Sequence, residues 1–275
     1  MSAPASTTRS GAPAPAGRLA MVLRQREYWS TVYRRTWRGS VISSFVSPLF
    51  YVAAMGVLLG GYVDAGDASL EGAPTYLAYI APGLLAAHVM QTASGEVLWP
   101  VMGMIKWNKT YYGMIATPLS VADIVAAQLM FVLFRVGSTA AVFMLVMAVF
   151  GVFETVTGAL LAFGVQLLIG MAFASVIFGY TAGLSSEAGF ALIYRLVIVP
   201  LFLFSGAFFP ISNLSAPLEW LARLTPLWHG VDLTRMLTIG SVDGSTALVH
   251  LAYLGVMSAF GWWWAVRRLT NRLVD

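Results

Sequence analysis

The chain has 275 residues, of which 59 % are hydrophobic and only 10 % are charged, and its formal net charge is +4. A soluble domain carries about 25 % charged residues, and no polar stretch here is long enough to bury a core of its own. This composition excludes an attached water-soluble enzyme domain. The sequence contains no cysteine, which excludes disulfides and thiol chemistry. We expect no nucleic-acid partner.

The first 38 residues divide into two parts. Residues 1–17 are almost entirely Ala, Pro, Ser, Thr and Gly. Such a segment cannot bury enough apolar surface to fold, so we expect a disordered tail. Residues 18–38 place aromatic and aliphatic residues opposite arginines at helical spacing, which is typical of an amphipathic helix lying in the headgroup layer. An ordinary basic flank that only orients the first span is the alternative.

Six apolar stretches follow, and almost none of their residues is charged. A spanning helix needs about 20 mostly apolar residues to cross the hydrocarbon layer. The sequence therefore predicts an all-α membrane protein in which residues 18–275 form a single transmembrane domain. The six predicted transmembrane helices are 41–62, 75–95, 124–153, 155–186, 196–209 with its apolar lead-in, and 244–266.

The charged residues outside these stretches indicate which side of the membrane each loop faces. Arginines precede the first stretch and follow the sixth, and both lysines lie between the second and third. The loop between the first and second stretches holds only acids: Asp64, Asp67 and Glu71. Basic residues concentrate on the cytoplasmic side. We therefore predict a multi-pass protein of a bacterial plasma (inner) membrane with both termini and the 96–123 loop in the cytoplasm.

The 96–123 loop is longer and less polar than a simple connection requires. It contains both lysines, two tryptophans and a tyrosine pair, and Pro100 and Pro118 are expected to break its helical segments. We interpret residues 100–118 as a coupling segment, a short helix on the cytoplasmic face that presents side chains to a partner.

Two polar positions inside the predicted spans are candidates for function. A charge near the middle of a span, as at Arg135, costs about 2.5–3.5 kcal/mol unless it is paired or wetted. Its partner is left open among Glu187, Glu96, Asp123 and helix-terminal carbonyls. Arg135 is expected either to clamp two helices together or to line the transport path. His88 and Gln91 in the second span are expected to form packing hydrogen bonds, with substrate contact as the alternative.

The segment at 207–243 is expected to hold short helices on the outer side, within residues 210–240. Ser215 is a suitable N-cap with Pro217 in the first turn, and Glu219 and Arg223 are spaced for an i,i+4 ion pair. Pro226 should stop this helix, and a second helix should run from about 230 to 240. The segment is interpreted as a lid over an outer cavity, with a plain extracellular helical hairpin as the alternative.

Three motifs carry a resemblance to a known family. They read KWNKTYY at 106–112 followed by ATPLS at 116–120, then SGAFFPI at 205–211, then TPLWHGVDLTR at 225–235. In this order and spacing the chain resembles the type-2 ABC exporter permeases, in the branch that includes nodulation lipo-oligosaccharide and actinobacterial drug-export permeases. The resemblance covers about residues 20–270. In that family the stretch before the last span forms short helices that re-enter the outer leaflet.

The resemblance implies a membrane half-transporter, a transport subunit rather than an enzyme. Two subunits, either two copies or a copy and a paralogue, pair in the bilayer. Each is driven by a separate ABC ATPase that binds ATP and Mg, so no cofactor, metal or catalytic residue is expected on this chain. The residues placed against the ATPase are Lys106, Trp107, Asn108, Lys109, Tyr111 and Tyr112.

The resemblance also implies a cargo path and an outer gate. In the family the first, second and fifth spans border a cavity between the two subunits, which suits an amphipathic lipid-linked saccharide, a lipid or a hydrophobic drug. The candidate path residues are Phe202, Phe204, Phe208, Phe209, Arg135 and His88. The candidate gate residues are Phe209, Pro210, Pro226 and Trp228.

The energy source has one alternative. The chain lacks the phosphate-binding motif GxxxxGK[ST], since neither lysine follows a glycine. Energy must then come from another polypeptide or from an ion gradient. A stand-alone proton-driven secondary transporter would need titratable groups near the membrane midplane and an internal repeat, and the sequence shows neither a repeat nor a carboxylate cluster in its spans.

Overall fold

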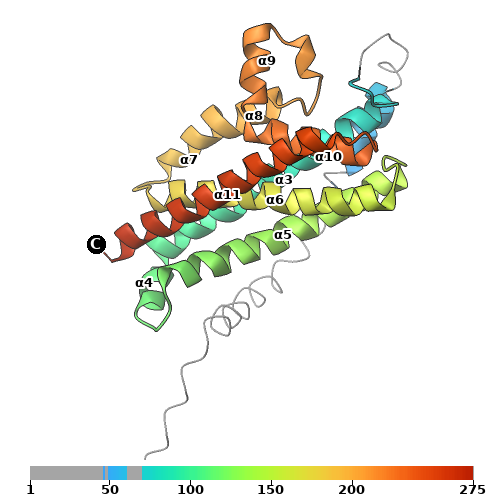
Figure 1. The fold of residues 1–275 in the computed structure, drawn as a ribbon. Coiled ribbons are helices and arrows are strands. Elements are labelled where there is room, and N and C mark those ends of the chain that lie inside the picture. Colours follow the sequence, from blue (N-terminus) through green and yellow to red (C-terminus); the bar gives the residue numbers. More distant parts are fainter. Residues whose placement is uncertain (1–45, 47–48, 61–69, 275) are drawn as a thin grey trace, which may run out of the picture.

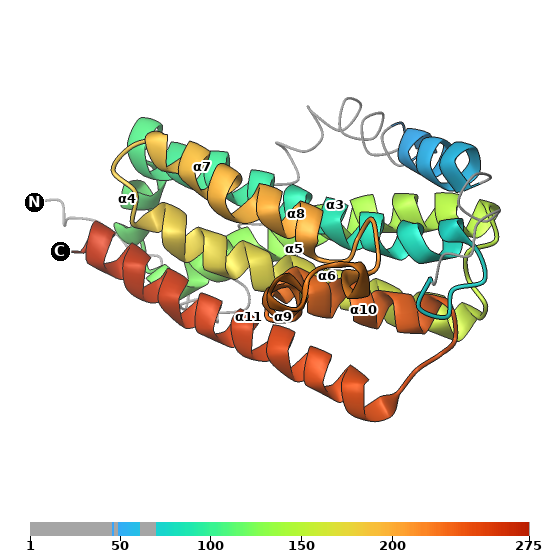
Figure 2. The ribbon, with the colours of Figure 1, turned by 90° about the horizontal axis from the view of Figure 1, so that it is seen from above.

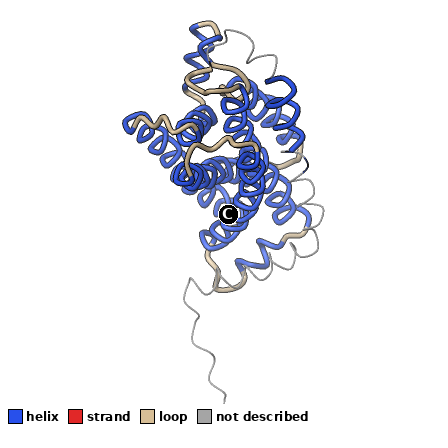
Figure 3. The backbone as a smooth tube through the Cα atoms, turned by 90° about the vertical axis from the view of Figure 1, so that its right-hand side faces the viewer, coloured by secondary structure: helices blue, strands red, loops and turns tan. Residues whose placement is uncertain are grey.

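The computed structural model describes residue 46, residues 49–60 and residues 70–274. The predicted tail at 1–17 and the predicted interfacial helix at 18–38 lie outside these residues. Throughout the described part every regular element is a helix, as Figure 3 shows. The predicted all-α fold is therefore confirmed.

The helices follow one another with short connections. Three elements, η1 to η3, are π-helical, and η4 is a 3-10 turn. In chain order the elements are η1 (Val52–Leu59), α3 (Tyr76–Met102), η2 (Gly103–Trp107), α4 (Thr110–Ile115), α5 (Val121–Val149), α6 (Val156–Ala182), α7 (Ala188–Ile193), η3 (Tyr194–Ile198), α8 (Val199–Phe204), η4 (Ile211–Asn213), α9 (Ala216–Arg223), α10 (Pro226–Thr238) and α11 (Gly244–Leu273).

Side-chain caps begin the longer helices. A capping oxygen satisfies one of the backbone N–H groups that have no partner within the helix. The Thr75 hydroxyl accepts from the Ala78 N–H at 3.1 Å, and Thr155 accepts from the Gly158 N–H at 3.0 Å. At α5, Ser120 and Asp123 form a capping box. The start of each of these helices is therefore determined by residues within its own first turn.

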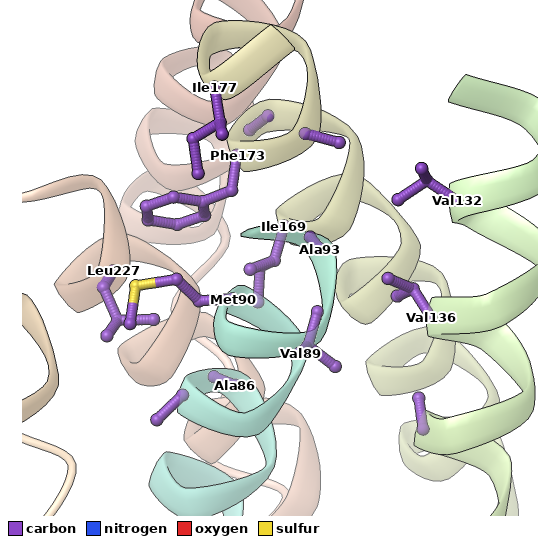
Figure 4. Packing of buried hydrophobic residues seen from close by; sticks show 14 of the residues in the cluster. Ala86, Val89, Met90, Ala93, Val132, Val136, Ile169, Phe173, Ile177 and Leu227 are labelled. Atoms are coloured by element: carbon purple, nitrogen blue, oxygen red, sulfur yellow. The ribbon is translucent and has the colours of Figure 1, made fainter. Parts of the chain in front are cut away.

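The core forms around α6, which packs against α3, α5 and α11. Figure 4 shows Val89 of α3, Val136 of α5 and Ile169 of α6 together in this core. A Cβ on Gly170 would lie 2.8 Å from Val136 Cγ1, so small residues let α5 and α6 approach closely. Apolar side chains on the outer faces of the long helices stay exposed, as expected where the solvent is lipid.

Different helices and turns lie at the two ends of the bundle. Figures 1 and 2 place α4 and the last turns of α11 at one end, which we call the α4 end. The α5–α6 turn, the start of α3 and the far part of α10 lie at the opposite end, which we call the α10 end. Helix α9 stands out from the side of the bundle (Figure 1).

The structure supports a multi-pass membrane protein. By length and composition, three of the described helices can cross a bilayer: α5, α6 and α11. The fifth predicted span is helical over Ala188–Phe204 but is divided into three short elements. Of the first predicted span, only residue 46 and residues 49–60 are described. The count of six spans therefore stays a prediction.

One expectation about proline was wrong, and the helix that was expected to start near 230 begins earlier, although α9 ends before Pro226 as expected. Pro100 does not break the chain, because α3 continues through it to Met102 and passes directly into η2. Pro226 does not merely end a helix but opens the next one, since α10 begins at this residue and not near 230. A proline in the first turn loses no intrahelical hydrogen bond and has a helical φ already.

Candidate functional site

The coupling segment lies at the α4 end, where η2 ends and α4 begins. Lys109 connects the two helices in the left-handed conformation with φ 51°. This tight reversal leaves the side chains of Trp107, Asn108 and Lys109 exposed. The segment thus turns a continuous strip of charged, polar and aromatic groups away from the bundle.

The two tyrosines attach the segment to the bundle. Tyr111 is buried and lies 3.5 Å from Gln128 Oε1, toward which its hydroxyl donates. The Tyr112 hydroxyl donates to the backbone carbonyl of Arg272 at 3.4 Å. Of the residues expected to contact an ATPase, Tyr111 therefore faces inward, whereas Tyr112 is exposed beside the end of α11.

Lys106 joins the coupling segment to the turn before α7. Its Nζ lies 3.0 Å from Glu187 Oε1. The hydrogen bond from Lys106 lowers the pKa of Glu187. Next to this pair, Trp99 stacks on Trp107 with ring centroids 6.0 Å apart and meets the buried Phe190 of α7 edge-on at 5.0 Å. The ends of α3, η2 and α7 therefore meet at one junction.

The structure identifies the partner of Arg135. Its Nε lies 2.8 Å from Glu96 Oε1, and both side chains are largely buried. The pair links α5 to α3 and neutralises a charge that would be costly within a span. Glu96 is one of the partners left open from the sequence, and this geometry matches the inter-helix clamp.

An open groove lies between α3 and the η3–α8 segment. Its volume is about 500 Å³, and its lining combines polar and apolar groups: Gln91, Thr92, Tyr194, Ile198, Val199 and Phe202. Of the candidate path residues, Phe202 lines the groove and Phe208 packs edge-on against Phe202 at 4.9 Å. His88 instead contacts Phe143 of α5, with ring centroids 5.9 Å apart. Phe204 is exposed and Phe209 is half-buried.

The loop after α8 turns sharply against α3. Gly206 has φ +75°, a conformation that L side chains rarely adopt. A Cβ on Gly83 of α3 would lie 2.6 Å from both the Cα and the carbonyl oxygen of Ala207. The loop backbone therefore rests directly on α3, and only glycine at 83 permits this approach.

Arg235 of α10 holds this loop in place. It is only 3 % exposed. It donates to the Gly206 carbonyl at 2.7 Å and to the Tyr79 carbonyl at 3.3 Å, and it lies 3.3 Å from the Glu71 carboxylate. Its guanidinium carbon also lies 3.9 Å from the Tyr79 ring centroid. Burial raises the pKa of Glu71, while Arg235 acts in the opposite direction.

A histidine pair joins α10 to α11 at the same end. The Nδ1 atoms of His229 and His250 lie 2.7 Å apart, so one of these two nitrogen atoms must carry no proton and accept the hydrogen bond. Asp232 Oδ2 lies 3.0 Å from His250 Nε2, and Tyr253 stacks on His229 with centroids 4.0 Å apart. Burial and the neighbouring His250 lower the pKa of His229, which lies between the fifth and sixth predicted spans, to about 4.

Of the candidate gate residues, Trp228 contacts the histidine pair. Trp228 packs edge-on against both histidines, Pro226 is the first residue of α10, and Pro210 is buried. Arg235 and His250 were not predicted from the sequence as buried polar groups. His250 lies within the sixth apolar stretch, where a titratable residue is itself a signal of function. No group of three or more metal-ligating side chains is found in the described part of the chain.

Comparison with known proteins gives a consistent result. A family model described as ABC-2 type transporter matches residues 19–238. Nodulation protein J of Rhizobium leguminosarum bv. trifolii is 30 % identical over 219 residues, covering 77 % of this chain and 81 % of that protein. Nodulation protein J of Rhizobium meliloti is 28 % identical over 240 residues, covering 84 % and 87 %. That of Sinorhizobium fredii is 28 % identical over 254 residues, covering 90 % and 94 %.

Proposed function

Because the chain belongs to the ABC-2 type transporter family, and is thus the membrane subunit of an ABC exporter, we propose that a separate ATPase drives it through the coupling segment at 100–118. ATP and Mg bind to that partner, and the permease moves an amphipathic molecule out of the cell. The membrane is the bacterial plasma (inner) membrane, with both termini cytoplasmic.

The observation that carries this proposal is the exposed strip on the coupling segment. Asn108 and Lys109 are exposed, and Trp107 is about half exposed although it stacks on Trp99, while Tyr111 and Tyr112 hold the segment in place. Exposed aromatic and cationic groups on a rigidly attached turn suit a protein interface, where aromatic residues provide most of the binding energy. A simple cytoplasmic turn would not need to hold such side chains outward.

The groove between α3 and η3–α8 supports the proposed class of cargo. Its polar groups, Gln91, Thr92 and Tyr194, lie beside the apolar Ile198, Val199 and Phe202. A lipid-linked saccharide, a lipid or a hydrophobic drug combines the same two characters. A second permease copy, or a paralogue, completes the cavity in the assembly. The 210–240 helices cover it on the outer side, with Phe209, Pro210, Pro226 and Trp228 at the gate.

We keep the division expected from the sequence, a cytoplasmic tail at 1–17 and a single permease domain at 18–275. A stand-alone proton-driven carrier is not favoured. Membership of an ATP-driven family argues against it, and the carboxylate that lies closest to Arg135, Glu96, is engaged in an ion pair.

The first test is purification of the chain from its native membrane in a gentle detergent, followed by mass spectrometry of the proteins that accompany it. We expect a stoichiometric ABC ATPase. Recovery of the intact chain alone, under conditions in which other ABC complexes survive, would contradict the proposal and favour an ion-driven carrier.

The second test reverses the charge of the coupling segment with K106E/K109E. We expect this variant to fold normally, because both side chains are exposed, and to lose export while ATP hydrolysis by the complex no longer depends on transport. The matched control is E154K, which reverses an exposed charge in the turn between α5 and α6, at the end of the bundle opposite α4. Unchanged coupled transport in K106E/K109E would count against the coupling segment.

A further inference from the structure

The helix formed by α7, η3 and α8 is loosely attached to the bundle. Among the described elements, α7 and η3 contact extensively only their neighbours in the chain, and α8 adds a contact with α10. Large apolar side chains such as Leu192, Leu196 and Val197 remain exposed along it. A helix with so few packing contacts can change its position at a lower cost than the buried α3 or α6.

The start of this helix is connected to the coupling segment rather than to the bundle core alone. Lys106 and Glu187, 81 positions apart, are joined at 3.0 Å. The Trp107–Trp99–Phe190 contacts make a second, apolar connection beside the first. Two independent interactions therefore join η2 to the first turn of α7.

A third contact supplies a pivot. The Tyr180 hydroxyl of α6 donates to the Gly189 carbonyl of α7 at 2.9 Å. The turn between them is tight, since a Cβ on Gly189 would lie 2.4 Å from Leu184 Cδ2. Glu187 thus lies between a helix fixed in the core and a helix that has few extensive contacts with the other described elements.

The far end of the same helix leads to the Gly206 turn. There the Gly206 carbonyl accepts from Arg235 and from the Tyr79 hydroxyl, which fixes the loop on α3. Between these two attached ends, Tyr194, Ile198 and Phe202 line the groove. Any tilt of η3 and α8 about the turn at 183–187 therefore changes the width of the groove.

From these contacts we infer that Glu187 is a positioning residue through which the coupling segment swings α7, η3 and α8 about the turn at 183–187. Lys106 transmits the movement through its ion pair, and the Trp99 stack keeps the two elements in register. The inference rests on the proposed function, because it needs an ATPase that moves the coupling segment. Movement of the coupling segment would then reach the groove through α7 directly, as well as through the continuous helix of α3.

The absence of cysteine in the sequence allows a specific probe of this movement. A nitroxide on V197C, an exposed position in η3, reports through its EPR line shape on the contacts of that helix. The measurement uses the permease with its co-purified ATPase in lipid nanodiscs, before and after addition of a non-hydrolysable ATP analogue. It is made in the V197C background and again with K106E, E187K and K106E/E187K.

We expect the analogue to change the line shape in the V197C parent. This change should fall in each single charge variant by up to about fivefold, the most that an exposed ion pair can contribute. The double variant restores the pair with opposite polarity and should recover most of the change. If Lys106 acted only by contacting the ATPase, the double variant would stay as low as K106E. E154K, which reverses an exposed charge in the turn between α5 and α6, is the matched control and should change nothing.

The possible failures separate the two proposals. If no ATPase accompanies the unlabelled chain, the proposed function fails and the inference fails with it. If the ATPase binds but V197C gives no response, or if E187K responds as fully as the parent, only the inference is overturned. Because Glu187 is exposed, misfolding is not expected in E187K, and retained binding of the ATPase confirms its fold.

Discussion

The two ends of the molecule place their charged groups differently. At the α4 end, Lys106 and Glu187 meet in the open, with both side chains more than a third exposed. At the α10 end, Arg235 is almost fully buried and donates to backbone carbonyls. An exposed ion pair contributes about 0–1 kcal/mol to folding stability. Removing one partner of a buried ion pair lowers that stability by about 3–5 kcal/mol. The weak exposed pair suits a segment that moves, such as α7. The strong buried contacts of Arg235 suit a segment that stays in place while α7 moves.

The largest effect is expected from breaking the fixed end with R235M. Methionine keeps much of the side-chain volume but leaves the Gly206 and Tyr79 carbonyls and the Glu71 carboxylate without this donor. We expect a loss of about 3 kcal/mol of stability, measured by thermal unfolding in detergent. R223M removes an exposed arginine that pairs at i,i+4 on α9 and should cost about 0.5 kcal/mol or less. Equal losses in the two variants would contradict the contrast between the ends.

A smaller effect is expected from G83A, which tests the contact of the Gly206 loop with α3. The added methyl would lie 2.6 Å from the Ala207 backbone, so the loop must move, at a cost of about 1–3 kcal/mol. G95A in the same helix meets nothing within 4 Å and should stabilise by up to about 1 kcal/mol. The stability changes are measured as the unfolding temperatures of the two variants relative to the parent. A stabilised G83A would show that the loop does not rest on α3.

The effect that is smallest at neutral pH comes from the histidine pair, and it grows as the pH is lowered. The pKa of His229 is lowered to about 4, below its ordinary value of 6.5, by burial and by His250. Between these two values the unfolded chain binds a proton that the folded chain does not, so stability falls as the pH drops from about 6.5 toward 4. H229F keeps a ring against Tyr253 and should weaken this dependence. An unfolding series from pH 7 to pH 4.5 tests it, and the same slope in both proteins would exclude His229 as its source.

The sequence was sufficient for features that depend on near neighbours. The apolar stretches located α5, α6 and α11, and the spacing of Glu219 and Arg223 predicted the ion pair found at 2.7 Å. Ser215 does precede α9, although its side chain makes no capping hydrogen bond. Such features are determined within one or two helical turns, where the pattern of residues fixes which groups can meet.

Features that depend on distant residues were not accessible in the same way. The choice of Glu96 for Arg135 required knowing how α3 packs on α5, and the approach of Lys106 to Glu187 joins two elements that no local pattern relates. Arg235 looked like one member of a short helix, and only its surroundings show that it is buried among backbone carbonyls. The prediction of a helix break at Pro100 was wrong, because α3 continues past this proline.

The π-helical elements have a consequence for sequence variation among relatives. A π turn holds one residue more than an α turn, so deletion of one residue there restores an ordinary α-helix without rotating the helix on either side. Such turns occur at η1, η2 and η3, which belong to the first predicted span, the coupling segment and the groove helix. Insertions and deletions of single residues within predicted helices of homologues should therefore concentrate at 52–59, 103–107 and 194–198.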